Sequence, residues 1–207
     1  MRVLFDKRYT GLEYHVILGN HDFSETGEHS LEILEEFAAL LKRKFHVYTQ
    51  ATEKVIDDVP VLFLPYPATA TSKKHVNVIH FETNGATRDN GKLIKCDIDT
   101  EDFCLGGHLH TPHRVKNTYY SGTLYQTNFG EALPKSFHHV RIKKNLKRRI
   151  VNVPNDPDLK LVNLEVYSRK DLLKISDNKM CLYKLFVHDG VRVNPEDLSQ
   201  YENVVRI

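Results

Sequence analysis

The amino-acid sequence predicts an α/β fold of the α+β type, made of one larger domain and a small β-α-β unit. Short apolar runs that end in Gly or Pro alternate with one amphipathic segment near the start of the chain. Several strand-like runs follow without another helical pattern, which favours a layered structure over a helical bundle. After a change of composition at residues 153–158, strand-like and helix-like segments alternate up to residue 207.

The larger domain, residues 1–152, is predicted to begin with a buried strand at 14–18 that ends at Gly19. Residues 30–44 carry apolar side chains at helical spacing, with Glu early and Lys or Arg late, as the helix dipole favours. Further strands are expected where apolar runs stop at Gly, Pro or polar residues, namely at 45–49, 59–67, 75–81 and, ending in Gly-Gly, within 102–110. Short strands with turns are expected at 118–131 and 136–142.

Residues 153–158, VPNDPD, are predicted to be a linker because they combine prolines with aspartates. The unit that follows, residues 159–207, is expected to fold as β-α-β-α-β. Pro195 falls in the first turn of its second helix, where proline is favoured. The expected strands are 161–168, 181–189 and 203–207, and the expected helices are 169–175 and 194–201.

The composition predicts a globular protein in a reducing compartment. Hydrophobic residues make up 41% of the chain and charged residues 27%, which is ordinary for a globular protein. No apolar run approaches the ~20 residues of a bilayer span, and the N-terminus lacks the apolar core of a signal peptide. Cys96, Cys104 and Cys181 have no metal-ligand spacing and indicate free thiols. We therefore expect a cytoplasmic protein without a membrane partner.

The charge distribution contains one dense basic run. The net charge is only +2, but five cations fall within residues 143–149. Such a run is most often a solvated linker or strand edge. The alternative is a patch that contacts phosphates, because each neutralised phosphate releases counterions and adds salt-sensitive affinity. The candidates for contact with a DNA backbone are Lys143, Lys144, Lys147, Arg148 and Arg149.

Three apolar runs pass into histidine at the end of a predicted strand: VILGNHD at 16–22, VNVIH at 76–80 and LGGHLH at 105–110. In layered α/β folds the C-terminal ends of strands form the ligand-binding edge, so side chains far apart in sequence can share one site. Each motif alone is usually a turn or a capped histidine, but their joint occurrence favours a metal site. Amide oxygen and imidazole are ligands for divalent ions. The predicted ligands are Asn20, His80, His108 and His110.

The order GNHD, a later histidine after a strand, and GHLH resembles the C-terminal signature of the calcineurin-like metallophosphoesterase superfamily. Within it, the chain is most similar to SbcD-type DNA repair exonucleases, in particular their bacteriophage recombination nuclease relatives. The similarity extends over VNVIHFETNG, GGHLHTPH and YYSGTLYQTNFGEALPKSF. The resemblance implies the C-terminal part of a four-layer α/β/β/α metallophosphoesterase sandwich, with residues 159–207 as part of a DNA-capping domain.

The resemblance also implies an enzyme that hydrolyses DNA phosphodiesters with two divalent metal ions of the Mn²⁺ type. Asn20, His80 and His108 would bind one ion, and His110 would bind the other. His21 would lie beside the scissile phosphate and assist the leaving oxygen. Asp22 would orient His21 through a hydrogen bond. His113, close to the last motif, is a candidate phosphate contact.

Two further motifs of the family, D-x-H and G-D-x-x-D, have no counterpart before Gly19. The second motif supplies the carboxylate that bridges the two ions. We therefore expect this chain to be incomplete or inactive by itself. It is either completed by a separate N-terminal polypeptide or the remnant of a longer enzyme.

The partners implied by the resemblance are DNA, bound by its backbone without sequence specificity, and an SMC-like coiled-coil ATPase of the SbcC type. The activity would be that of an exonuclease or endonuclease in double-strand break repair or recombination, in the host cytoplasm for a phage protein. Two alternatives stay open. One is a phosphomonoesterase or nucleotide phosphodiesterase of the same superfamily, and the other is a non-catalytic DNA-binding fragment.

Overall fold

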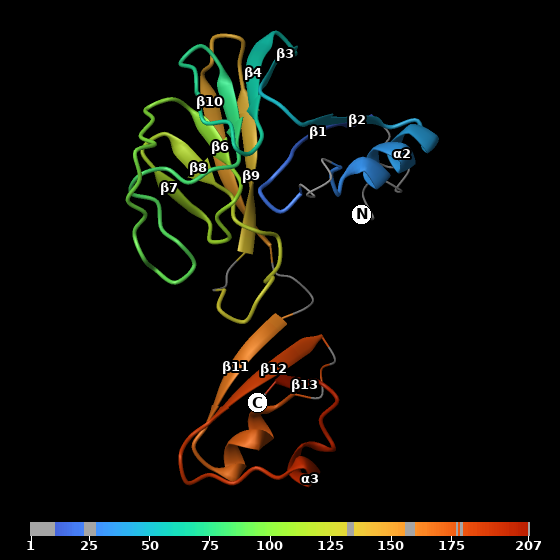
Figure 1. Ribbon diagram of the computed structural model, residues 1–207, viewed down its shortest axis with the longest axis vertical. Coiled ribbons are helices and arrows are strands. Elements are labelled where there is room, and N and C mark those ends of the chain that lie inside the picture. The colour runs from blue at the N-terminus through green and yellow to red at the C-terminus, as the bar shows by residue number, and fades with distance from the viewer. Residues whose placement is uncertain are drawn as a thin grey trace.

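The computed structural model describes residues 11–22, 28–131, 135–155, 160–176, 178 and 180–206. Within these ranges the strands form four sheets, accompanied by few helical segments (Figure 1). The mixed α/β class predicted from the sequence is therefore confirmed. No helix in this part of the chain is both long and apolar enough to cross a bilayer.

The largest sheet has six strands in the order β3-β4-β5-β6-β8-β7. Its central strands β4, β5, β6 and β8 are parallel to their neighbours, while β3 and β7 pair antiparallel at the edges. Because parallel strands end at the same edge, the residues that follow β5 and β6 lie side by side. The strands are β3 (Thr52–Ile56), β4 (Val59–Leu64), β5 (Val76–Ile79), β6 (Cys104–Gly106), β7 (His113–Val115) and β8 (Thr118–Tyr120).

An antiparallel hairpin of β9 (Lys135–Ile142) and β10 (Arg148–Asn155) covers the main core of this sheet. The hairpin runs along the sheet in Figure 1. Apolar side chains of the hairpin, Val140, Ile142 and Ile150, pack against a buried cluster. That cluster consists of Tyr48, Val59, Val61, Phe63, Val76 and Phe103.

The sequence does not predict β10, because its residues combine the end of the basic run with the start of the predicted linker. Arg148 and Arg149 are both exposed and Ile150 is partly buried, so β10 does not show the strict alternation that identifies a strand in a sequence. Pro154 is compatible with β10 because the strand pairs on one side only, with β9. Residues 153–155 therefore belong to a strand, and the remainder of the predicted linker, 156–158, lies outside the described residues.

A separate parallel pair is formed by β1 (Glu13–Ile17) and β2 (Lys44–Tyr48), which α2 (Glu32–Leu40) connects. A cavity of about 390 Å³ lies between β1, β5, β6 and β9 and is lined largely by apolar side chains. The end of β1 is tied to the main sheet where β4 ends, because the Tyr66 amide donates to the Leu18 carbonyl at 3.0 Å. This tie places the loop at 19–22 beside the C-terminal edge of the sheet.

Several predicted elements are longer than those in the structure. The helix expected at 30–44 is α2 alone, because the chain adopts a left-handed backbone at Lys42 (φ +52°) that ends it. In the segment 102–110 the strand β6 ends at Gly106, as the Gly-Gly pair predicted, and His108 (φ +73°) then turns the chain. In the segment 118–131, predicted to hold short strands with turns, β8 ends at Tyr120 and Gly122 (φ +74°) turns the chain. The short strands β3 and β7 were not predicted.

The C-terminal unit follows the predicted element order. Its three strands are all parallel, in the order β11-β12-β13. They pack with two short helical segments around their own core of Val166, Leu172, Ile175, Tyr183 and Leu185. The elements are β11 (Lys160–Val166), the 3-10 helix η2 (Arg169–Lys174), β12 (Cys181–Val187), α3 (Pro195–Leu198) and β13 (Val204–Arg206).

The close packing of Gly106 against Tyr120 can be tested. A Cβ at Gly106 would lie 2.6 Å from the Tyr120 ring, and this ring is fully buried with its hydroxyl donating to the Phe81 carbonyl. We expect Gly106→Ala to lower the free energy of unfolding by about 1–3 kcal/mol, as overpacking does. Urea denaturation measures the change. Gly11→Ala, where a Cβ meets nothing within 4 Å, is the control, and equal losses in the two variants would contradict the packing argument.

Candidate metal centre

Three of the predicted ligands meet at one atom. Asn20 lies beyond the end of β1, His80 directly follows β5, and His108 follows β6 by two residues. His80 Nε2 is 3.1 Å from Asn20 Oδ1, and His108 Nδ1 is 3.2 Å from the same oxygen. The two imidazole rings are edge to face, with centroids 5.1 Å apart. The adjacent ends of β5 and β6 thus bring together side chains that are 60 and 88 residues from Asn20 in sequence.

Both imidazoles are kept neutral by their surroundings. Burial, followed by the neighbouring His108, lowers the pKa of His80 from 6.5 to about 4. Burial also lowers the pKa of His108. A neutral imidazole offers a nitrogen lone pair, which is the form that binds a metal ion. Two imidazole nitrogens and one amide oxygen therefore form a set of neutral ligand atoms.

The backbone at these ligands is tightly constrained, at Gly19 by close packing and at His108 by its conformation. A Cβ at Gly19 would lie 2.6 Å from His80 Cε1, so only glycine lets the ring take this position. His108 itself has φ +73°, a left-handed conformation that costs energy for a residue other than glycine. Such strained residues concentrate at functional sites, where surrounding structure holds them in place.

His21 and Asp22, the predicted catalytic residues, lie beside this cluster. His21 is exposed, and its charge lowers the pKa of both His80 and His108, which places it near them. Asp22 Oδ2 accepts from the Gly19 amide at 2.7 Å, and Asp22 Oδ1 accepts from the Ser30 hydroxyl at 2.8 Å. Asp22 therefore closes the loop, and among the described residues it makes no hydrogen bond to His21.

His110, the fourth predicted ligand, is near the cluster but turns to other partners. Its charge contributes to lowering the pKa of His80 and of His108. Its Nδ1 lies 2.8 Å from Glu131 Oε1 and 3.4 Å from Asp89 Oδ2. His110 is therefore oriented by carboxylates and, in the described structure, does not join the hydrogen bonds at Asn20.

Glu131 is the centre of a buried polar network. Its side chain and that of Lys135 are both 0% exposed, and Lys135 Nζ lies 2.6 Å from Glu131 Oε2. Asn128 Nδ2 donates to Oε1 at 2.8 Å, and the Thr127 hydroxyl also donates to Oε1. Burial opposes the ionisation of Glu131, but hydrogen bonds from Lys135, Thr127 and His110 outweigh it and lower its pKa to about 2. Glu131 is thus a carboxylate at neutral pH.

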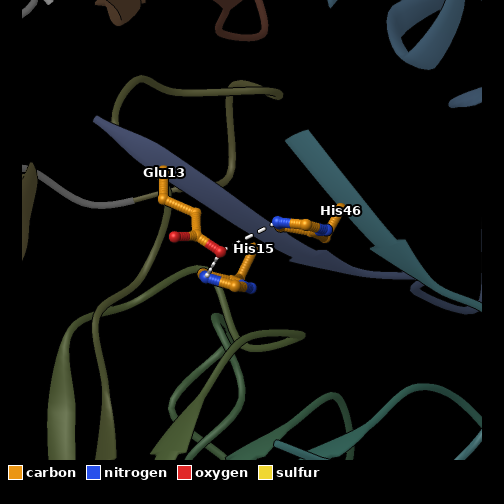
Figure 2. Close-up of side chains that lie close together, drawn as sticks. All are labelled: Glu13, His15 and His46. Carbon is orange, nitrogen blue, oxygen red and sulfur yellow. Dashed lines mark ion pairs between the residues drawn. The ribbon is translucent and has the colours of Figure 1, made fainter. Parts of the chain in front are cut away.

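Among the described residues, two groups of His, Asp and Glu side chains have ligand atoms within 4.8 Å of one another and could hold a metal ion. One group is Asp89, His110 and Glu131. In this group Glu131 already accepts several hydrogen bonds, so it is better placed to fix the tautomer of His110 than to bind an ion. The other group, Glu13, His15 and His46, lies on β1 and β2 (Figure 2).

The sequence analysis missed the carboxylates around the centre. Glu82 Oε1 is 3.6 Å from His108 Nε2, and Arg88 pairs with Glu82 at 2.9 Å. A signal for Glu82 was available, because it follows His80 by two residues and side chains two apart in an extended segment point to the same side. Asp89 lies in a turn, and Glu131 lies in a loop whose path a sequence pattern does not reveal.

The residues predicted to contact DNA either lie far from Asn20, His80 and His108 or make contacts within the fold. His113 Nε2 accepts from the Thr87 amide at 3.2 Å, and its Nδ1 donates to the Thr111 carbonyl at 2.8 Å, so both ring nitrogens bind backbone. In the basic run, the Arg148 guanidinium stacks over the Phe103 ring, 4.2 Å from its centroid. Phe103 is the residue directly before β6.

The turn at 143–147 joins β9 to β10 next to the starting ends of β5 and β6, where one cavity is lined by His75, Val76, Phe103, Leu146 and Arg148. The candidate ligands His80 and His108 follow the opposite ends of these strands. Lys144 pairs with Asp58 at 2.6 Å, and Lys143, Lys147 and Arg149 are exposed in the same region. The basic run is therefore separated from Asn20 by at least the length of a strand, on the order of 10 Å.

No protein-family model matches the chain, and no curated protein matches it. The fold and the site together define a mixed α/β protein in which one asparagine and two histidines, the candidate metal ligands, gather at the C-terminal edge of a parallel sheet. The resemblance to metallophosphoesterases is an expectation from the short motifs in the sequence.

The buried pair of Glu131 and Lys135 leads to a prediction on stability. Glu131→Gln leaves the Lys135 ammonium buried without its counter-charge, so we expect a loss of about 3–5 kcal/mol in the free energy of unfolding. Glu131→Gln combined with Lys135→Met removes both charges and should recover part of this loss. Urea denaturation of the two single variants and the double variant measures the coupling. Additive losses would show that the two charges do not stabilise each other.

The low pKa of His80 leads to a prediction on pH dependence. The unfolded chain binds a proton at this residue near pH 6.5, and the folded chain does so only at about pH 4. Between these values the unfolded state holds more protons, so the contribution of His80 is complete above pH 6.5 and is lost as the pH falls toward 4. With EDTA present, wild type should lose more stability over this range than His80→Asn. Parallel pH curves would contradict the burial of a neutral His80.

Proposed function

We propose that the protein is a metal-dependent phosphoesterase of the nuclease type, in which Asn20, His80 and His108 hold one divalent ion. The observation that carries this proposal is that two neutral imidazole nitrogens lie 3.1 and 3.2 Å from Asn20 Oδ1. Amide oxygen suits harder ions such as Mn²⁺, and imidazole nitrogen suits Fe²⁺ or Zn²⁺, so the mixed set is compatible with a divalent first-row metal ion. An ion held there supplies Lewis-acid activation of a phosphate oxygen and of a water molecule.

The roles of the neighbouring residues follow from their positions. His21 is exposed beside His80 and His108, so it can reach a bound phosphate and donate a proton to the leaving oxygen. Asp22 keeps this loop closed through Gly19 and Ser30, which fixes where Asn20 and His21 lie. Asp22 is accordingly a positioning residue in this proposal.

For a second ion, we propose His110 as a ligand through Nε2. Its Nδ1 faces the ionised Glu131 at 2.8 Å, so the proton stays on Nδ1 and the lone pair of Nε2 is available. Within the described residues, no carboxylate joins the atoms at Asn20 Oδ1 to bridge two ions. We therefore expect the chain alone to bind one ion well and to cleave its substrate slowly.

A large substrate is favoured by the position of the C-terminal unit. Gln126 Nε2 donates to the Leu161 carbonyl at 3.1 Å, and the Leu161 amide donates back to Gln126 Oε1 at 2.9 Å. Asn163 Nδ2 donates to the Phe129 carbonyl at 2.7 Å. These contacts hold β11 against the loop that carries Glu131, close to His110. A folded unit beside the centre suits a polymer such as DNA better than a small phosphomonoester.

The proposal also assigns the described sheets to a larger architecture. In it, the six-stranded sheet and the β9–β10 hairpin are part of an α/β/β/α metallophosphoesterase sandwich, and β11 to β13 belong to a DNA-capping domain. The second candidate function is phosphomonoesterase activity at the same centre. It needs the same ligands around Asn20 but gives no role to the C-terminal unit that the contact between Gln126 and Leu161 holds beside the centre.

The proposed function predicts Mn²⁺ binding that depends on the three ligands. Titration of Mn²⁺ into the full chain, followed by the electron paramagnetic resonance signal of free Mn²⁺, should show binding that His108→Asn weakens by more than about tenfold, as loss of a ligand does. His188→Asn is the matched control, since His188 is exposed and pairs with Glu165 within the C-terminal unit, not with the residues around Asn20. Equal binding by all three proteins would reject the centre.

Substrate class is then measured with the same three proteins. Mn²⁺-dependent nicking of plasmid DNA that His108→Asn abolishes supports the nuclease. Hydrolysis of p-nitrophenyl phosphate without DNA cleavage supports the phosphomonoesterase instead. DNA binding with neither reaction, despite Mn²⁺ binding, would identify a non-catalytic fragment.

A further inference from the structure

A second set of metal-ligand side chains lies on the paired strands β1 and β2. Glu13 and His15 are two residues apart on β1 and therefore point to the same face. His46 is the register partner of His15 on the parallel strand β2. Figure 2 shows the three side chains directed at one another from the two strands. With two ligands on one strand and a third on the neighbouring strand, one face of the sheet can supply three ligands to the same ion.

The distances between the ligand atoms suit a transition metal. His46 Nε2 is 2.9 Å from Glu13 Oε1, and His15 Nε2 is 3.3 Å from the same oxygen. All three ligand atoms lie within 4.8 Å of one another. Tetrahedral ligands at about 2.0–2.2 Å from Zn²⁺ are themselves roughly 3.3–3.5 Å apart. Small side-chain rotations would therefore bring the three atoms to coordination distance.

His15 is held in the orientation that a ligand needs. Its Nε2 is buried and makes no hydrogen bond to the described residues, although Glu13 Oε1 lies 3.3 Å away, and a buried polar atom without a hydrogen bond is unfavourable unless something else binds there. Its Nδ1 lies 2.7 Å from the Tyr48 hydroxyl. The ring is also stacked between His46 and Phe63, with centroids at 4.9 and 5.4 Å. A hydrogen bond on the far ring nitrogen fixes the tautomer in most histidine metal sites.

The ammonium group of Lys54 already lies next to two of the three proposed ligands. Lys54 Nζ is 3.0 Å from Glu13 Oε1 and 3.4 Å from His46 Nε2. Lys54 comes from β3 and is partly exposed, so its long side chain can turn to solvent. The ammonium satisfies the carboxylate of Glu13, but within the described structure His15 Nε2 still makes no hydrogen bond.

We propose that Glu13, His15 and His46 form a structural site for one Zn²⁺-type ion, which displaces the Lys54 ammonium and clamps β1 to β2. Two imidazoles and one carboxylate leave a fourth position for water, and imidazole nitrogen suits Zn²⁺, Co²⁺ and Ni²⁺. Within the described residues the two strands are short and pair over five register positions. The clamp would therefore stabilise the strand that leads into Gly19 and Asn20. This proposal is independent of the proposed function, because none of its ligands belongs to the centre at Asn20.

Co²⁺ tests this site because its visible d–d absorption reports coordination by nitrogen and oxygen. The titration uses the full chain carrying His80→Asn and His108→Asn, which removes the centre at Asn20. We expect this protein to bind one Co²⁺ and to melt at a higher temperature with the ion. Adding His46→Asn should weaken binding by more than about tenfold. Adding Lys54→Met should strengthen binding, because the competing ammonium is gone.

The control variant is His188→Asn in the same background. His188 pairs with Glu165 at 2.7 Å, much as His46 pairs with Glu13 at 2.9 Å, but no third ligand accompanies it within the described structure. Unchanged Co²⁺ affinity in His46→Asn, or no absorption bands in the starting protein, would overturn the proposal. If the starting protein does not fold, the wild-type chain is titrated instead, and His46→Asn must then lower the number of bound Co²⁺ ions by one. An unchanged number would equally overturn it.

Discussion

The candidate centre depends on one structural constraint, which is that the parallel strands β5 and β6 end beside each other. His80 and His108 follow these ends, so the hydrogen-bond ladder between the strands sets the separation of their rings. Asn20 is brought to them by a backbone hydrogen bond from the Tyr66 amide to the Leu18 carbonyl, which ties the end of β1 to the main sheet. The glycines at 19 and 107 then let backbone approach the His80 ring closely enough for Asn20 Oδ1 to meet both imidazoles.

The sequence predicted the parts of this arrangement that depend on strand ends. Asn20, His80 and His108 each follow an apolar run, and the ends of parallel strands meet by a general rule of α/β folds. Glu131 and Asp89 could not be found in this way, because loops place them and no periodic pattern describes a loop. The element boundaries failed for a related reason. The helix predicted at 30–44 ends at Leu40, before Lys42 takes a positive φ, and a residue's type alone did not reveal this.

The basic run shows the difference between composition and position. Its five cations suggested contact with phosphates, but the turn that carries them lies at the starting ends of β5 and β6, opposite the ligands. Arg148 stacks on Phe103 and Lys144 pairs with Asp58, so part of the charge is used within the fold. A polymer that touched both the run and Asn20 would have to cross the sheet. The C-terminal unit, which contacts the loop bearing Glu131, is the better-placed neighbour of the centre.

The pair of Glu131 and Lys135 indicates that the loop before β9 serves the centre as well as the fold. A buried ion pair seldom adds stability over apolar residues of similar size, because both charges lose their hydration. Here the ionised Glu131 also faces His110 Nδ1, and Lys135 Nζ donates to the His110 carbonyl at 3.2 Å. Both members of the pair therefore hold the same residue, one through its ring and one through its backbone. An apolar pair of equal volume would fill the space but would leave the tautomer and orientation of His110 unspecified.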